Sequence, residues 1–218
     1  MESYINDADK TLDWGINMPN KVLIATLYSP EPVILAITKM EGVNRLLLLI
    51  DKEPDKQQTN ALKLIKDSFG KVIDVVAVKT EVYDIVKVAS KCVELIDTQP
   101  KDDLIYVNIT SGRKTKAIGL LFAAYARHDR VKKIAYNPEE DKSTVVYLPR
   151  LSFKLTESQK LILGFLDAGN YSSIKELSDK IDLSTAMLYR AIDELKDMDL
   201  ISTEEGLKLT DAGKIARL

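Results

Sequence analysis

The fold prediction starts from one stretch, Leu104-Ile105-Tyr106-Val107-Asn108-Ile109-Thr110-Ser111-Gly112-Arg113-Lys114-Thr115-Lys116. An apolar run ends in small polar residues and one glycine, and an Ala/Leu-rich helical pattern begins at Ala117, which is the order strand, loop, helix. A loop that opens a helix presents free backbone N–H groups and the positive end of the helix dipole. Because Arg113, Lys114 and Lys116 lie at an end that disfavours cations, we expect a negative partner there. The stretch therefore predicts the floor of an anion site.

A simpler interpretation remains open at this point. Ser111 would cap the helix, and the three cations would be solvated. The phosphate loop of nucleotide triphosphatases needs a glycine five residues before a Gly-Lys pair, whereas Gly112 is the only glycine in this loop. The rest of the chain has to decide between the two interpretations.

Short apolar runs alternate with amphipathic helical patterns from Lys21 onward. Such near-continuous apolar runs are typical of parallel strands that are buried on both faces. The expected strands are Val22–Ala25, Leu46–Ile50, Val72–Val76, Leu104–Val107, Val131–Tyr136 and Thr144–Tyr147. The expected helices between them are Pro32–Met40, Asp55–Phe69, Val82–Ile96 and the one that begins at Ala117. This alternation predicts an α/β fold, a Rossmann-like, doubly wound and mostly parallel sheet, whose last two strands form a hairpin at the edge.

Ligands of doubly wound sheets bind beyond the carboxyl ends of the strands that flank the switch in strand order. Two loops compete for that place: the opening stretch and the loop Thr26–Pro32 after the first strand. In the second loop, Tyr28 can stack on a base or pack in the core, and Ser29 can bond a phosphate or ribose or cap the next helix ahead of Pro30. Asp51 resembles a ribose-binding acid, but no G-x-G-x-x-G precedes it, so an NAD site is a weak prediction.

Composition narrows the possible chemistry. The chain has 218 residues, 45% hydrophobic and 29% charged, with a net charge of −2. With Cys92 as the single cysteine and His128 as the single histidine, the chain can form neither an intrachain disulfide nor a metal site built from cysteines or histidines. We expect His128 to lie at a solvent-exposed helix end. The longest apolar run, Leu46–Ile50, is too short to span a bilayer, so we expect no membrane segment. We also expect a cytoplasmic protein with neither a metal site nor a cofactor.

The alternation of short apolar runs with helical patterns ends after Tyr147, and from Thr156 the sequence pattern is helical. We expect helices at 156–168, 173–181 and 184–198, a hairpin at 200–210 and a last helix at 211–218. This order resembles a winged helix-turn-helix. The expected division is therefore an N-terminal arm 1–20, a ligand-sensing domain 21–148, a linker 149–155 and a winged helix-turn-helix domain 156–218.

In a winged helix-turn-helix, residues near the start of the second helix of the motif read double-stranded DNA. Arg190 is the best candidate for a guanine contact, and the further candidates for DNA contacts are Ser184, Thr185, Tyr189 and Lys208. Residues 150–218 carry ten Lys or Arg and twelve Asp or Glu, with Glu204 and Glu205 at the wing tip. This acidic balance predicts modest DNA affinity for a monomer and leaves a protein-binding winged helix as the alternative.

The two halves together resemble the archaeal CRISPR-associated transcription regulators, which join a CARF (CRISPR-associated Rossmann fold) domain to a winged helix. The resemblance rests on the Tyr28-Ser29 loop and on Asn108-Ile109-Thr110-Ser111-Gly112-Arg113-Lys114, which is similar to the family's Asn-x-Thr-Gly-Gly-x-Lys loop. Ser111 stands where the family often has its first glycine.

This resemblance implies a homodimer that binds a cyclic oligoadenylate, most often the tetra-adenylate, and couples it to DNA binding. Phosphates would meet Ser111, Gly112, Arg113 and Lys114, while adenines or riboses would meet Thr26, Tyr28, Ser29 and Asn108, with Thr110 also at the site. Two alternatives stay open: a slow ring nuclease that uses Ser29 and Lys114, and a regulator that senses another nucleotide.

Overall fold

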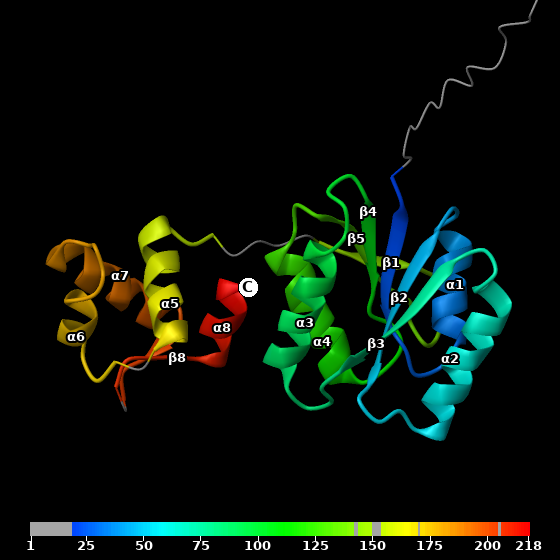
Figure 1. Cartoon of the computed structure of the whole chain (residues 1–218), viewed down its shortest axis with the longest axis horizontal. Helices are drawn as coiled ribbons and strands as arrows, with labels where there is room; N and C mark the ends of the chain where they lie inside the picture. The colour runs from blue at the N-terminus through cyan, green and yellow to red at the C-terminus, as the bar shows by residue number, and fades with distance from the viewer. Residues whose placement is uncertain (1–18, 142–143, 150–153, 170, 205) are drawn as a thin grey trace, which may run out of the picture.

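The computed structural model describes residues 19–141, 144–149, 154–169, 171–204 and 206–218 (Figure 1). The expected arm 1–20 lies almost wholly outside these residues, as does most of the expected linker 149–155. The described residues form an α/β unit and a C-terminal helical unit, and each has its own hydrophobic core.

The α/β unit is built on a six-stranded sheet with the order β3-β2-β1-β4-β5-β6. The strands are β1 (Lys21–Thr26), β2 (Arg45–Asp51), β3 (Asp74–Thr80), β4 (Leu104–Asn108), β5 (Val131–Tyr136) and β6 (Val146–Leu148). β1 to β5 are parallel, and β6 runs antiparallel to β5. The prediction of a Rossmann-like, mostly parallel sheet with a hairpin at its edge is confirmed.

The strand order reverses between β1 and β4, which lie side by side at the centre of the sheet. The chain first winds outward from β1 to β3 and then returns to the other side of β1 to add β4 to β6. The loops after β1 and β4 therefore leave the sheet as neighbours, at the place where a doubly wound fold binds its ligand.

Four helices cover the two faces of the sheet (Figure 1). They are α1 (Glu31–Lys39), α2 (Lys56–Phe69), α3 (Ile85–Asp97) and α4 (Lys114–Ala126). Successive side chains of β1 point to opposite faces, so Leu23 packs in the core beneath α1 and α2, and Ile24 packs beneath α3 and α4. This double burial is the reason that the central strands read as continuous apolar runs.

Two predicted boundaries on the edge-strand side are wrong. The strand expected at Val72–Val76 begins at Asp74, because the amide groups of Val72 and Ile73 both bond to the carbonyl of Phe69 in the turn after α2. The helix expected from Val82 begins at Ile85, because the side chain of Asp84 accepts a hydrogen bond from the amide of Lys87 and caps the first turn.

The structure also excludes the two serine caps that the sequence left open as alternatives. α4 begins at Lys114, three residues earlier than expected, and its N-cap is Arg113 instead of Ser111. α1 begins at Glu31 with Pro30 as its N-cap, so Ser29 does not cap it. Both serines lie in the loops before these helices, where their polar groups bond to each other across the switch point.

The C-terminal unit contains α5 (Glu157–Ala168), α6 (Ile174–Ser178), α7 (Thr185–Asp197), β7 (Ile201–Ser202), β8 (Lys208–Leu209) and α8 (Asp211–Arg217). Thr156 and Gln159 form a capping box at the start of α5, and Ser184 caps α7. α6 ends three residues earlier than expected, and β7 pairs with β8 antiparallel. Leu163, Leu188 and Ile192 are fully buried in the core that these elements share.

α8 packs on both units, since it contacts α5 of its own unit and also α3 and α4 of the α/β unit (Figure 1). At this junction, Arg127 donates from Nη1 to the backbone carbonyl of Leu218. The same guanidinium also forms a two-point ion pair with Asp97, at 2.8 and 2.9 Å. Arg127, which the sequence places at a solvated helix end, is thus a contact between the two units.

Candidate functional site at the switch point

The hydroxyl group of Ser111 joins the two loops that meet at the switch point. Its Oγ accepts hydrogen bonds from the amide groups of Tyr28 (2.9 Å) and Ser29 (3.1 Å) and donates to the carbonyl of Ser29 (3.2 Å). Ser111 is 5% exposed, so these bonds form within the protein and not in solvent. A glycine at this position, as in the resembling family, would remove all three bonds.

Gly112 sits at the closest approach of the two loops. Its φ of +88° lies in the left-handed region, and a Cβ atom there would come within 3.1 Å of the Cβ of Thr26. Thr26 is fully buried, and its hydroxyl donates to the carbonyl of Ser111. Thr26 is therefore a support of the loop, and its expected contact with the ligand stays a prediction.

A second group of buried polar contacts holds the loop after β4 from the other side. The carboxamide of Asn108 accepts from the amide of Thr110 (3.0 Å) and donates to Asn137 Oδ1 (3.2 Å). The amide of Asn137 donates to the Thr110 hydroxyl (2.8 Å). Asn108 is 2% exposed and also supports the loop, and its expected contact with the ligand stays a prediction. Asn137 was read from the sequence only as part of the hairpin turn.

The start of α4 presents free donors to solvent. Among the residues that the structure describes, the amide groups of Gly112, Arg113, Lys114 and Thr115 have no protein acceptor. Those of Arg113, Lys114 and Thr115 are the unpaired N–H groups of a helix start, and Gly112 lies just before the N-cap. The side chain of Lys114 is exposed beside them. This end of the helix can bind an anion such as a phosphate.

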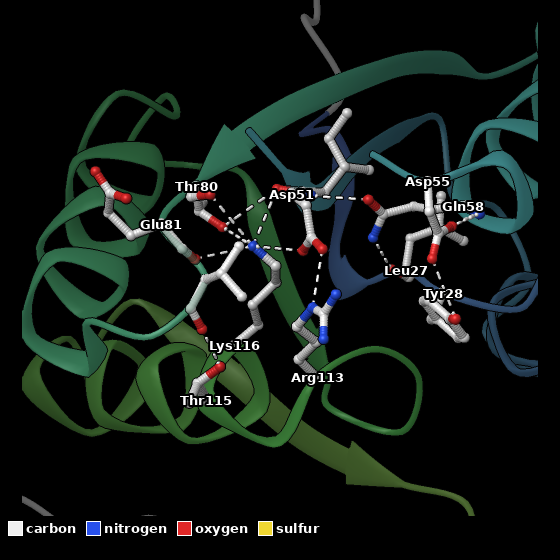
Figure 2. Close-up of polar contacts among 12 residues, drawn as sticks. Leu27, Tyr28, Asp51, Asp55, Gln58, Thr80, Glu81, Arg113, Thr115 and Lys116 are labelled. Carbon is white, nitrogen blue, oxygen red and sulfur yellow. Dashed lines mark hydrogen bonds and ion pairs between the residues drawn. The ribbon is translucent and has the colours of Figure 1, made fainter. Parts of the chain in front are cut away.

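The other two cations have an internal partner that the sequence did not reveal, which is Asp51 at the end of β2 (Figure 2). Arg113 Nε lies 2.9 Å from Asp51 Oδ2, and Lys116 Nζ lies 3.1 Å from Asp51 Oδ1. Lys116 is completely buried, so its negative partner is Asp51 and not an anion in solvent at the helix start. The negative partner anticipated for the cations is, for these two, part of the protein.

Electrostatics at this cluster follow from burial and pairing. Burial alone raises the pKa of Asp51, but hydrogen bonds and charges of Arg113 and Lys116 outweigh it and hold the pKa below its usual value. Burial lowers the pKa of Lys116, and Asp51 opposes this shift. The hydrogen bond to Asp51 raises the pKa of Arg113, which stays charged.

The loop after β1 brings an aromatic side chain, Tyr28, to the site. The hydroxyl group of Tyr28 donates to Asp55 Oδ2 (3.2 Å), which raises the pKa of the phenol. Gln58, buried in the first turns of α2, accepts from the amide of Asp51 (2.9 Å) and donates to the carbonyl of Leu27 (2.7 Å) (Figure 2). The half-buried Tyr28 is thereby held at the mouth of the site. Next to it, a groove of about 510 Å³ runs between Pro30 and the first turns of α2.

A larger cleft lies elsewhere. It has a volume of about 950 Å³ and separates the start of α3 from the C-terminal unit, with Tyr83 and Ile85 on one wall and Met198 and Ile215 on the other. Val82, just before the wall residue Tyr83, is joined to the first turn of α4, since its carbonyl accepts a hydrogen bond from the hydroxyl of Thr115 (2.5 Å).

The residues expected to contact DNA are exposed in the C-terminal unit. Ser184 is the N-cap of α7, Thr185, Tyr189 and Arg190 lie in its first half, and Lys208 lies on β8. Ser184 Oγ also accepts from the amide of Met187, and Arg190 Nε is 2.9 Å from Glu194 Oε1. The guanidinium of Arg190 thus carries an acidic neighbour one helical turn away.

The described part of the chain offers neither a cluster of residues for metal binding nor a cysteine nucleophile. No group of three or more His, Cys, Asp or Glu side chains there could hold a metal ion. Nor does any described helix have both the length and the apolar character needed to cross a bilayer. Burial raises the pKa of the Cys92 thiol to about 12, which leaves it unreactive as a nucleophile. His128 is exposed at the far end of α4.

The fold is therefore a Rossmann-like α/β domain, and the start of α4 lies at its switch point. Residues 21–141, more than half of the chain, match the family model described as HFX_2341_N:-like, N-terminal, so the chain belongs to this family. No curated protein matches the sequence.

Solved structures similar to this chain are distant. Can2 from Sulfobacillus thermosulfidooxidans in complex with cyclic tetra-adenylate has a TM-score of 0.48 and 14% identity, over 90% of this chain and 64% of that one. Protein VC1899 from Vibrio cholerae has a TM-score of 0.48 and 13% identity over the same shares. A type III CRISPR defence DNA nuclease activated by cyclic oligoadenylate has a TM-score of 0.42 and 16% identity, over 54% of this chain and 18% of that one. This chain spans less than two thirds of the length of each, and such distant likenesses carry no functional assignment.

Proposed function

We propose that the α/β unit is a CARF domain that binds a cyclic oligoadenylate at the switch point between β1 and β4. The ring that we expect is cyclic tetra-adenylate. The observation that carries the proposal is the pairing of two features there. The start of α4 offers four unpaired amide groups and the exposed Lys114 for a phosphate, and the loop after β1 offers Tyr28 for a base. The similarity of the loop Asn108–Lys114 to the pattern Asn-x-Thr-Gly-Gly-x-Lys, with Ser111 in place of the first glycine, supports it.

The ligand contacts that we propose are those that the supporting residues leave accessible. Phosphates meet the amide groups of Gly112 and Arg113 and the ammonium of Lys114, while Tyr28 and Ser29 meet the base or ribose. Thr110 lies half-buried behind them. A ring of repeated nucleotides is itself symmetric, so two copies of the chain, related by a two-fold axis, can bind one ring with identical contacts.

For the C-terminal unit we propose a winged helix-turn-helix that binds double-stranded DNA, with the ligand changing its affinity. Three helices, a short hairpin and a further helix follow one another in that order, and α7 exposes Thr185, Tyr189 and Arg190 in its first turns. A dimer would place two copies of α7 on a palindromic site. Coupling of this kind is reciprocal, so DNA must change the ligand affinity by the same factor.

Calorimetric titration of the purified chain with cyclic tetra-adenylate tests the ligand. We expect one ring per two chains, and weaker binding by about tenfold or more for Lys114→Ala, because a charge-assisted contact to a phosphate is lost. Lys101→Ala is the matched control, since Lys101 is exposed in the turn before β4, at the opposite end of this strand from the switch point. Absence of binding for cyclic rings of any size would remove the proposal.

The same samples decide whether the ring is cleaved. Chromatography of the ligand after incubation separates ring from linear product. The ring nuclease alternative requires a linear product that is absent from the Lys114→Ala and Ser29→Ala variants. Binding of an ordinary dinucleotide in place of the ring would instead favour a regulator that senses another nucleotide.

A further inference from the structure

Lys116 is a buried lysine that the proposed ligand contacts do not use. Its ammonium group has no exposed surface and lies 2.6 Å from Thr80 Oγ1, 3.1 Å from the carbonyl of Ile50 and 3.0 Å from the carbonyl of Glu81 (Figure 2). The same nitrogen lies 3.1 Å from Asp51 Oδ1. Lys116 thus ties the first turn of α4 to the ends of β2 and β3.

Asp51, which pairs with Lys116, also binds the guanidinium of Arg113. Its Oδ2 accepts from Arg113 Nε at 2.9 Å, and the carboxylate is only 6% exposed, whereas the Arg113 side chain is 41% exposed. Within the described residues, Nη1 and Nη2 of Arg113 have no acceptor. The guanidinium is therefore fixed through Nε on its inner side and keeps its outer donors for another partner.

We propose that Asp51 and Lys116 are positioning residues, which hold the outer N–H groups of Arg113 toward a phosphate at the start of α4. This inference rests on the proposed function. Lys116 is held by fixed strand ends, it holds Asp51, and Asp51 orients Arg113. A guanidinium that is oriented before binding loses little side-chain entropy on binding, and its planar fork matches two phosphate oxygens.

A second physical reading predicts the opposite sign. If Asp51 only competed with the phosphate for Arg113, its removal would make the site more positive and strengthen anion binding. If Asp51 orients Arg113, its removal weakens binding although the site becomes more positive. The sign of the change in ligand affinity therefore separates the two.

The test is the affinity of Asp51→Asn for cyclic tetra-adenylate, measured by calorimetry beside wild type. We expect binding weaker by about tenfold, the loss of one oriented charge-assisted contact. Glu53→Gln is the matched control, since it removes one negative charge from the exposed loop after β2 without touching Arg113, and it should bind at least as tightly as wild type.

Asp51→Asn leaves the buried Lys116 without its carboxylate partner and can lower the melting temperature. The double variant Asp51→Asn with Lys116→Met removes both buried charges and serves as the second test. We expect it to melt closer to wild type than Asp51→Asn and to bind the ring as weakly as the single variant. Affinity equal to or above that of wild type, in either folded variant, would overturn the proposal.

A readout without ligand keeps this inference separate from the proposed function. The Nε–H of Arg113 should give a slowly exchanging side-chain NMR signal, assigned by its absence from Arg113→Lys. It should persist in Lys114→Ala and vanish in Asp51→Asn. If wild type binds no ring yet shows this signal, the proposed function fails and the orienting contact stands. If the signal exchanges as fast in wild type as in Asp51→Asn, the positioning role fails whatever the chain binds.

Discussion

Ser111 and Gly112 show how two adjacent residues divide the work of building the loop after β4. Ser111 has an ordinary backbone conformation and uses its hydroxyl to bind the neighbouring loop, while Gly112 takes the left-handed turn. The family pattern with two glycines supplies the turn but not the hydroxyl group. Compared with a glycine at the same position, Ser111 has less backbone freedom but forms three hydrogen bonds with the neighbouring loop.

Gly112→Ala should disturb this loop. A residue with a Cβ at φ +88° costs about 1–2 kcal/mol, and the new Cβ would meet Thr26 at 3.1 Å. We expect the free energy of unfolding in urea to fall by at least that amount and ring affinity to fall with it. Gly164→Ala is the control, because a Cβ at Gly164 has no atom within 4 Å. Wild-type values for Gly112→Ala would contradict the close approach.

Asp51 should give the protein an acid-dependent stability. Its pKa is lowered in the folded state, so its ion pairs stabilise the fold above the unfolded pKa of about 3.9 and lose that effect as the pH falls through the folded pKa. We expect the free energy of unfolding of wild type to decline more steeply between about pH 5 and pH 2 than that of the Asp51→Asn, Lys116→Met double variant. Parallel curves in chemical denaturation would show that Asp51 is not ion-paired in solution.

At the scale of elements, the pattern of apolar runs was enough to predict the sheet, because strands buried on both faces have a simple sequence signature. The starts of α1, α3 and α4 were not predictable in the same way, since each depends on a local cap or turn. The pairing of Asp51 with Lys116 could not be predicted either, because it joins two elements that lie 65 residues apart and nothing in a helical pattern marks a lysine as buried.

The pair α3 and α4 gives another case. Gly119 lies in the middle of α4, where a Cβ atom would approach Val88 Cγ1 of α3 to 2.6 Å. The two helices can pack this closely only without a side chain there. The sequence alone shows a glycine inside a helical pattern, but not which neighbour requires it.

Arg190 on α7 is the element-scale test of DNA binding. Its ion pair with Glu194 occupies part of the guanidinium and places a negative charge near any DNA phosphate. We expect Glu194→Gln to raise DNA affinity by several-fold at low salt, and Arg190→Ala to lower it, in fluorescence anisotropy with a palindromic duplex. Lys175→Ala on α6 is the matched control for loss of one positive charge. Equal affinities for Arg190→Ala and Lys175→Ala would move the contact away from the start of α7.

At the scale of the whole molecule, the two units meet through helices. α8 packs on α3 and α4, and Arg127 bonds both to Asp97 and to the carbonyl of Leu218. The start of α3, which lines the cleft between the units, is tied in turn to the first turn of α4 through Val82 and Thr115. A contiguous chain of contacts thus leads from the switch point to the C-terminal unit.

Arg127→Ala should weaken the coupling without weakening the ligand site. The change removes the contact to α8 at the far end of α4, away from the loops at the switch point. We expect ring affinity in the absence of DNA to stay within about twofold of wild type, while the ratio of DNA affinities with and without ring moves toward one. Lys132→Ala, exposed on β5, is the control. An unchanged ratio would show that the signal takes another route.

The place of α8 also bears on how this protein can be taken apart and rebuilt. One helix packs against the core of the C-terminal unit and at the same time contacts α3 and α4 of the α/β unit. A chimaera that joins this α/β unit to a foreign C-terminal half would lose that surface even if both halves folded. A working transplant has to carry α8 together with the outward faces of α3 and α4, so these three helices are expected to change in concert among relatives.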